Sequence, residues 1–377
     1  MNKSRRKRII STLALCAVSM TTLMSTGCGK SNDDDEYTIA VITKQDIAFW
    51  HDVQNGAEDA GEELNAKILY NEGGESDYPQ GDNDFATQVE YIDYAIKEGV
   101  DAIVIAPNAT TELNEAFNKA EAAGIKLINI NSRAQYGGIL SCVHSSDADA
   151  GAVGARYAAD AVLGSDKVRL VMTRGDVKLD DVKELGRGAV AIMPHTAATA
   201  AARVGGFKSQ AVASISKQMA SDGVDISKIG LTEQEVAAMF QKFFVDCEPS
   251  ATVDAAYEEA KRVLSDKDSN VICFFATNTN TTLGVCKAVD ELGLQDTVYV
   301  IGFNSDDSEL NYLKRGVLDG TIIQNPYNMG YVGVRYAVNA SKGSGVPGDL
   351  DTGVTYITAE TMNTDYVKLL LNPRELD

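Results

Sequence analysis

Short apolar segments alternate with amphipathic helical segments along this chain, and that alternation constrains the fold more than any other feature. In the first half, the segments expected as strands are residues 37–43, 67–70, 101–106 and 125–130. Between them, apolar residues recur at helical spacing, as in Val53, Ala57, Ala60 and Leu64. Strands that alternate with helices in this way predict a parallel sheet covered by helices on both faces.

The same pattern restarts in the second half of the chain. Strands are expected at residues 168–172, 271–276, 298–301 and 321–324, and helices at 147–163, 199–219, 253–264, 279–292 and 328–341. Residues 174–196 and 220–250 fit this rhythm poorly and are expected to be insertions. Because 377 residues suffice for two separate cores, we expect two doubly wound parallel-sheet lobes.

The first residues have the composition of a targeting segment. Five of the first eight residues are basic, and an apolar stretch follows from Ile9 to about Met24. Small residues then precede Cys28, which predicts a secretory signal peptide over residues 1–27. An uncleaved anchor helix is the alternative, although the stretch is short and polar for a membrane span. Residues 28–36 are polar and acidic and are expected to form a solvated tether.

Composition excludes several classes of partner. The formal net charge of −20 argues against a nucleic-acid partner. The three His residues lie far apart in sequence, so we predict no metal site. Neither a phosphate loop nor a Gly-x-Ser-x-Gly elbow is found, which argues against a cofactor and against catalysis. Cys142 could pair with Cys247, but sequence alone does not establish it.

Polar residues follow the expected strands, where a parallel sheet collects its ligands. The segments in question are residues 44–50, 107–111, 131–133, 278–280, 304–307 and 324–326. They contain amides, hydroxyls, a guanidinium and the adjacent aromatics Phe49 and Trp50. Aromatic faces cover C–H surface, and amides hydrogen-bond hydroxyls, so this set predicts a binder for a neutral polyol.

Several of these segments carry a family resemblance. The motifs are VDAIVIAP at 100–107, RVGGF at 203–207, FATN at 275–278, VIGFN at 300–304 and GTIIQ at 320–324. Together they resemble the type I periplasmic binding proteins for sugars, the ribose- and galactose-binding group, over about residues 37–370. Separately, the Gly27-Cys28 junction resembles the lipobox of bacterial lipoproteins, in which the Cys is lipidated and becomes the new N-terminus.

The resemblance implies a set of ligand-contacting residues. These are Phe49, Trp50, Asn131, Arg203, Asn278, Asn304 and Gln324. Asn131 and Asn304 stand where the family often has Asp, and an amide adds a donor and removes a charge.

Each of these residues also has a purely structural interpretation. The two aromatics could cap a core, and Arg203 could form a salt bridge. Asn278 and Asn304 could cap helices, and Gln324 could hydrogen-bond within a hinge.

The resemblance further implies a lipid-anchored extracytoplasmic binding protein of an ABC-type transporter. It would bind a sugar or sugar-like ligand between its lobes by hinge closure, as a monomer without cofactor or metal. Its implied partners are the ligand, the transporter's membrane subunits and, through Cys28, the membrane. A ligand sensor feeding a membrane receptor stays open, with an enzyme on the same scaffold as the weaker alternative.

The lobes are expected to share a three-strand hinge. The first lobe would comprise residues 37–144 plus 325–354, and the second 145–324 plus 355–377. The chain would then cross between them near residues 143–146, 324–326 and 353–356.

Overall fold

The computed structural model describes residues 36–44, 47–70, 85–164, 189–221 and 241–374. The leader, Cys28, nearly all of the tether and the strand expected at 168–172 lie outside these ranges. Within them, no helix is both long enough and apolar enough to cross a membrane.

Within the described ranges, the first sheet has six strands in the order β11-β5-β4-β3-β1-β2, all paired in parallel. Its strands are β1 (Tyr37–Ile42), β2 (Ala66–Leu69), β3 (Ala102–Ile105), β4 (Lys126–Ile130), β5 (Ile139–His144) and β11 (Asp349–Asp351). Its helices are α2 (Ala48–Leu64), α3 (Phe85–Glu98), α4 (Asn114–Ala122) and α13 (Pro326–Ser341). The doubly wound sheet expected from the sequence is therefore confirmed, with β5 and β11 as additional strands.

Alternate residues of each strand face opposite helical layers, as the period of two requires. In β1, Ile39 and Val41 pack in the cluster formed with α2 and α13. Ala40 and Ile42, their neighbours in sequence, pack in the cluster formed with α3 and α4. Both faces of the sheet are therefore buried at its centre, which explains why β3 is apolar along its whole length.

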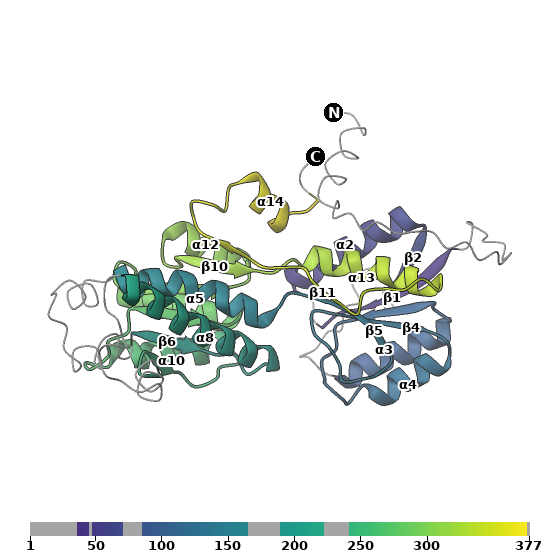
Figure 1. The fold of residues 1–377 in the computed structure, drawn as a ribbon, viewed down its shortest axis with the longest axis horizontal. Helices are drawn as coiled ribbons and strands as arrows, with labels where there is room; N and C mark the ends of the chain where they lie inside the picture. The colour runs from purple at the N-terminus through teal and green to yellow at the C-terminus, as the bar shows by residue number, and fades with distance from the viewer. Residues whose placement is uncertain (1–35, 45–46, 71–84, 165–188, 222–240, 375–377) are drawn as a thin grey trace. The chain divides into compact units, whose positions relative to one another are not determined.

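Helices α2 and α13 lie side by side although hundreds of residues separate them in sequence (Figure 1). Glycines allow this close approach. A Cβ added at Gly56 would lie 2.0 Å from the Tyr327 carbonyl oxygen, and one at Gly330 would lie 1.8 Å from that of Val53. The chain thus returns to its first lobe through a helix pair that tolerates no side chain at these two positions.

In the described part of the chain, the second sheet also has six strands, in the order β12-β10-β9-β8-β6-β7. Its strands are β6 (Val190–Met193), β7 (Phe244–Asp246), β8 (Cys273–Ala276), β9 (Tyr299–Phe303), β10 (Gly320–Ile323) and β12 (Thr355–Ile357). Its helices are α5 (Asp147–Gly164), α8 (Ala198–Ser221), α10 (Val253–Ser265), α11 (Thr279–Leu292), α12 (Asp307–Arg315) and α14 (Asp365–Leu371). Among the strands of the described residues, only β12 pairs antiparallel, at the edge beside β10.

Two sequence-based expectations for this lobe were wrong in the parts that the structure describes, whereas residues 174–188 and 222–240 lie outside the described ranges. Residues 174–196 were expected to be an insertion, but β6 lies between β7 and β8 and all four of its residues are buried. Residues 220–250 were also expected to be an insertion, yet they contain the edge strand β7. Strands this short carry no periodicity of their own, and only pairing with neighbouring strands identifies them.

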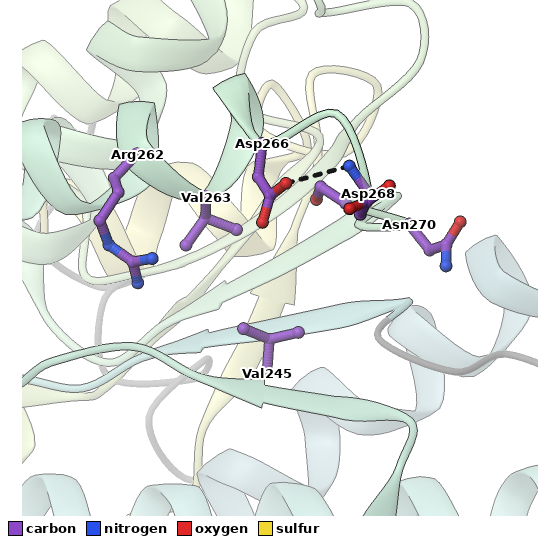
Figure 2. Close-up of a pocket in the computed structure, with 7 residues that line it drawn as sticks. Val245, Arg262, Val263, Asp266, Asp268 and Asn270 are labelled. Atoms are coloured by element: carbon purple, nitrogen blue, oxygen red, sulfur yellow. Dashed lines mark hydrogen bonds between the residues drawn. The ribbon is translucent and has the colours of Figure 1, made fainter.

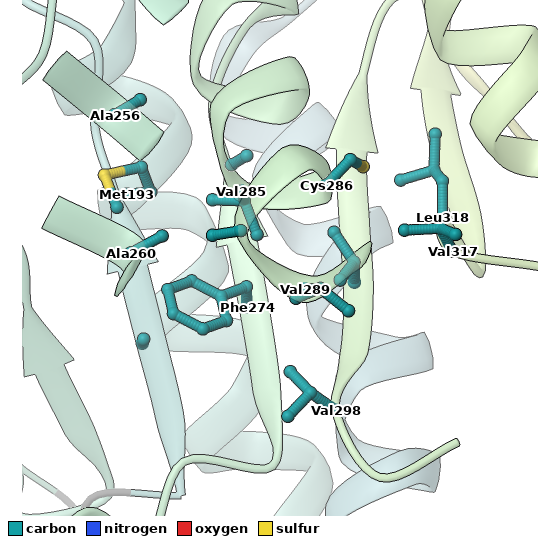
Figure 3. Close-up of a cluster of buried hydrophobic side chains, with 14 of the residues drawn as sticks. Met193, Ala256, Ala260, Phe274, Val285, Cys286, Val289, Val298, Val317 and Leu318 are labelled. Atoms are coloured by element: carbon teal, nitrogen blue, oxygen red, sulfur yellow. The ribbon is translucent and has the colours of Figure 1, made fainter. Parts of the chain in front are cut away.

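Each face of the second sheet carries its own hydrophobic cluster. On one face, α5 and α8 cover Ile192, Phe275 and Phe303. On the other, α10 and α11 cover Met193 and Phe274, as Figure 3 shows. The two clusters hold the strand ends of this lobe in a defined arrangement.

The chain passes between the two sheets at three places. β5 ends at His144 and α5 begins at Asp147, β10 ends at Ile323 and α13 begins at Pro326, and β11 ends at Asp351 and β12 begins at Thr355.

Hydrogen bonds connect the first and third of these crossings. The Thr352 amide donates to the His144 carbonyl oxygen at 2.7 Å, and the Ser145 hydroxyl donates to the Gly353 carbonyl oxygen at 2.8 Å. The Ser146 amide donates to Asp351 Oδ1 at 3.1 Å. These two crossings therefore form one hydrogen-bonded unit.

Candidate functional site

The carboxyl edge of the first sheet gathers Lys44, Trp50 and Asn131. Lys44 follows β1, and its Nζ donates to Asn131 Oδ1 at 3.2 Å. The same ammonium lies 6.0 Å from the centroid of the Trp50 ring. Burial lowers the pKa of Lys44 from 10.5 to about 8. Two strand ends far apart in sequence thus place a cation, an amide and an aromatic ring together.

The two aromatics have different environments. Trp50 is only 5% exposed and packs within the core cluster that contains Val41 and Val53. Phe49 is partly buried, and its ring meets that of Trp50 edge to face at 4.8 Å. Trp50 therefore lies in the core, because the α2 register turns its side chain toward the sheet.

Arg203 connects three elements at the carboxyl edge of the second sheet. From α8, its Nε donates to Asp147 Oδ1 at 2.8 Å, at the start of α5. Its NH1 group donates to the Thr277 carbonyl oxygen at 2.6 Å, just past β8. Its guanidinium lies 3.7 Å from the centroid of the Phe303 ring, at the end of β9. The side chain is 7% exposed, so the salt-bridge interpretation is correct but the pair is buried.

Asn278 caps α11, one of the two roles considered for it from the sequence. Its side chain accepts a hydrogen bond from the Thr281 amide, and the Asn278 backbone amide donates to Thr281 Oγ1. This reciprocal arrangement is a capping box, and it places the amide at the carboxyl end of β8.

Asn304 and Gln324 are brought together from two neighbouring strands. Gln324 Nε2 donates to Asn304 Oδ1 at 3.2 Å, and Asn304 Nδ2 donates to Thr279 Oγ1 at 3.2 Å. Asn304 has a φ of 83°, and Asn131 in the first sheet has a φ of 61°. Both sit directly after a strand in the left-handed region, where Asn is tolerated better than most residues. The two amides are thus held at equivalent positions of the two sheets.

A buried acid, Glu309, lies next to this amide pair and shares the partner Thr279 with Asn304. Glu309 is 0% exposed, and its Oε2 accepts from Thr279 Oγ1 at 3.3 Å and from the Asp306 amide at 2.9 Å. Its Oε1 has no hydrogen-bond partner in the described part of the chain. Burial raises the pKa of Glu309 from 4.5 to about 8. The carboxyl group is therefore largely protonated at neutral pH.

Residues 39–345 match the profile of the periplasmic binding protein domain. The chain belongs to this family.

Among curated relatives, this binding protein is similar to the xylitol-binding protein of Mycolicibacterium smegmatis, with 23% identity over 83% of this chain and 75% of the relative. It is equally similar to the D-allose-binding periplasmic protein of Escherichia coli, with 23% identity over 81% of this chain and 85% of the relative.

A solved carbohydrate transporter solute-binding protein from Agrobacterium radiobacter, in complex with D-arabinose, shares the fold with a TM-score of 0.67. It is 25% identical and covers 90% of this chain and 100% of its own.

Four residues of this binding protein were missed as site residues by sequence reasoning: Lys44, Asp147, Thr279 and Glu309. Lys44 lies in the segment 44–50, of which only the aromatics Phe49 and Trp50 were expected to contact the ligand. Asp147 has an ordinary role as an acid in the first turn of α5. A signal existed for Glu309, because Asp306 and Glu309 have the spacing of a capping box.

A separate pocket of about 200 Å³ lies against α10 and β7. Figure 2 shows Arg262, Asp266, Asp268 and Asn270 around it, with the Asp268 amide donating to Asp266 Oδ1 at 3.0 Å. The loop that follows α10 leads into the amino end of β8, so this pocket lies at the opposite edge from Asn278. It is not part of the candidate site.

Cysteine and metal chemistry add little to the site. Cys142 and Cys247 are buried free thiols, in β5 and after β7 respectively, so the pairing left open by the sequence is not formed. Within the described ranges, no group of His, Cys, Asp and Glu has the arrangement to hold a metal ion.

Proposed function

We propose that this chain is an extracytoplasmic solute-binding protein, lipid-anchored through Cys28, which binds a sugar or sugar-like ligand and delivers it to an ABC-type transporter. The xylitol-, allose- and arabinose-binding relatives support the ligand class. The secretory leader supports the location. The protein returns its ligand chemically unchanged.

One observation carries the proposal: amide and cationic side chains gather at the carboxyl edges of both sheets. Lys44 and Asn131 lie at one edge, and Asn304, Gln324 and Arg203 at the other. Amides both donate and accept, which suits the alternating hydroxyls of a sugar. Arg203 and Asn278 already have protein partners, so we assign them mainly to positioning the second edge.

The proposed mechanism is closure of the two lobes about their three connections. A ligand that contacts both edges binds the closed state more tightly and shifts the equilibrium toward it. The expected lobe boundaries, near residues 144, 325 and 354, define the moving bodies. Closure would create a composite surface for the transporter's membrane subunits.

The test is a thermal-shift screen of the mature protein against pentoses, hexoses, polyols and their acid derivatives. A true ligand raises Tm in proportion to ln(1 + [L]/Kd). Calorimetry then measures its affinity, and mass spectrometry checks that it is recovered unchanged. Failure of every compound to bind, or chemical turnover of a bound one, contradicts the proposal.

A matched pair of variants tests the site itself. Gln324→Ala should weaken binding by about 1–3 kcal/mol, because it leaves Asn304 without its donor partner. Gln210→Ala is the control, since the Gln210 side chain donates to Ser214 Oγ on the same helix, α8. Equal affinities for the two variants would place the ligand elsewhere.

A further inference from the structure

Lys44 is a cation with unused hydrogen-bonding capacity at the proposed ligand site. An ammonium has three donors and no acceptor. One donor goes to Asn131 Oδ1 at 3.2 Å, and the Trp50 ring lies 6.0 Å away. Both neighbours are uncharged. No ion pair of Lys44 with a carboxylate is formed within the described part of the chain.

The other charged or ionisable groups that act on Lys44 do not cancel its charge. They are Asp147 on α5, Arg203 on α8 and Cys142 on β5. Asp147 is paired with Arg203, whose Nε lies 2.8 Å from Asp147 Oδ1. Burial raises the pKa of the Cys142 thiol to about 12, so it carries no charge at neutral pH. The ion pair and the thiol are together neutral, so among the described residues Lys44 leaves one excess positive charge.

The surrounding amides supply no negative charge to balance the charge of Lys44. Asn131, which accepts from Lys44, and Asn304 at the opposite edge are neutral where carboxylates would supply negative charge. Glu309 is largely protonated because it is buried, as described above. A partly buried cation without a counter-charge is costly, and an anionic ligand removes that cost.

We propose that the ligand is a sugar acid, an aldonate or uronate, whose carboxylate is bound by Lys44 while the amides bind its hydroxyls. This inference rests on the proposed function and deepens it. A carboxylate is favoured over a phosphate because one excess positive charge balances one negative charge. A phosphate monoester carries about −1.5 to −2 at neutral pH and needs more cations.

The experiment compares ligands that share a carbon skeleton, by calorimetry on the mature protein at about pH 6.5, where Lys44 is protonated. The sets are glucose, gluconate, glucuronate and glucose 6-phosphate, with matching galactose and arabinose derivatives. We expect one acid to bind at least about tenfold more tightly than its neutral sugar, as for a charge-assisted hydrogen bond.

Two variants test whether Lys44 is responsible. Lys44→Met keeps an unbranched apolar stem and removes the charge, so the preference for the acid should disappear. Lys287→Met removes the same charge from an exposed lysine of α11 that pairs with Asp254, and the preference should stay. Acid binding by Lys44→Met as tight as the wild type overturns the inference.

The pH profile of the wild type is a second measurement that does not depend on a variant folding. The free pKa of Lys44 is about 8, and a bound carboxylate raises it. Affinity for the acid should therefore be constant below about pH 8 and fall about tenfold per unit above it, while neutral-sugar affinity stays flat. A flat profile for the acid overturns the inference.

The outcomes separate this inference from the proposed function. Binding of neutral sugars with rejection of the acids removes the sugar-acid assignment and leaves the binding function intact. Tightest binding of glucose 6-phosphate would overturn the sugar-acid assignment and show that the ligand's anionic group is a phosphate. Binding of no compound in the panel contradicts both proposals together.

Discussion

Arg203 and Asp147 form a buried ion pair at the carboxyl edge of the second sheet, with Arg203 Nε 2.8 Å from Asp147 Oδ1 and side chains 7% and 21% exposed. Arg203 also satisfies the Thr277 carbonyl oxygen at 2.6 Å. A single side chain on α8 therefore holds the start of α5 and the end of β8 in place. We therefore expect loss of the Arg203 side chain to lower the stability of the fold, whether or not a ligand is bound.

Arg203→Ala should destabilise the protein by about 3–5 kcal/mol, because it leaves Asp147 as an unpaired charge in a largely buried position. Denaturant unfolding measures the loss. The double variant Arg203→Ala, Asp147→Asn should recover part of it, since no charge is then stranded. An Arg203→Ala protein as stable as the wild type would contradict the structural role.

Trp50→Ala should also lower stability, by about 3–5 kcal/mol, because the ring is 5% exposed within the first lobe's core. Trp50→Phe should cost less, since it keeps an aromatic ring in the same space. As Trp50 is the sole Trp of the chain, its fluorescence reports on this core directly. An emission maximum at the wavelength of solvent-exposed indole in the folded protein would contradict the burial.

Two adjacent glycines of α8 should respond in opposite directions to alanine. A Cβ at Gly206 would lie 2.0 Å from the Ala148 carbonyl oxygen, so Gly206→Ala forces α5 and α8 apart. Gly205 is exposed, with nothing within 4 Å of its Cβ position, so Gly205→Ala should stabilise the helix by about 0.5–1 kcal/mol. Thermal melts of the two variants check this. Equal Tm shifts of the same sign would refute the helix packing.

Glu309 should make stability fall as pH rises. Burial raises its pKa from 4.5 to about 8 in the folded state, so the folded protein binds the extra proton between those values. Stability is then lost from about pH 4.5 to about pH 8, by on the order of a few kcal/mol.

The measurement is unfolding free energy against pH for the wild type and Glu309→Gln. The amide does not titrate, so the unfolding free energy of the variant should increase relative to that of the wild type as pH rises. Burial also raises the pKa of Asp52 and of Asp319 to about 6, but both groups titrate in both proteins and cancel in the difference. A pH-independent difference would show that Glu309 is not buried as a neutral acid.

Cys28→Ser should abolish lipid attachment and either release the protein from membranes or leave an unprocessed precursor. The prediction rests on the Gly27-Cys28 junction after a basic and then apolar leader. Membrane fractionation and gel migration provide the readout. Cys16→Ser, within the apolar stretch of the leader, is the matched control and should behave as wild type. Identical behaviour of the two variants would exclude the lipid anchor.

Local signals predicted the elements that carry them most strongly. The helix expected at residues 279–292 begins and ends there, because Asn278 caps its first turn and Gly293 ends it with a φ of 65°. The strand–helix alternation predicted both sheets, because each strand buried on two faces must be apolar along its whole length. The amides after β4 and β9 were likewise predicted from their position at strand ends.

The sequence by itself thus determined the fold class and the strand ends at which the candidate site residues lie. Only the tertiary structure decided that residues 190–193 form an inner strand, that Trp50 belongs to the core and that Arg203 is neutralised by Asp147. It also left Lys44 beside an amide, without a carboxylate partner in the described residues. Each of these depends on which residues far apart in sequence come into contact, and helix register and strand pairing decide that only when the whole sheet assembles.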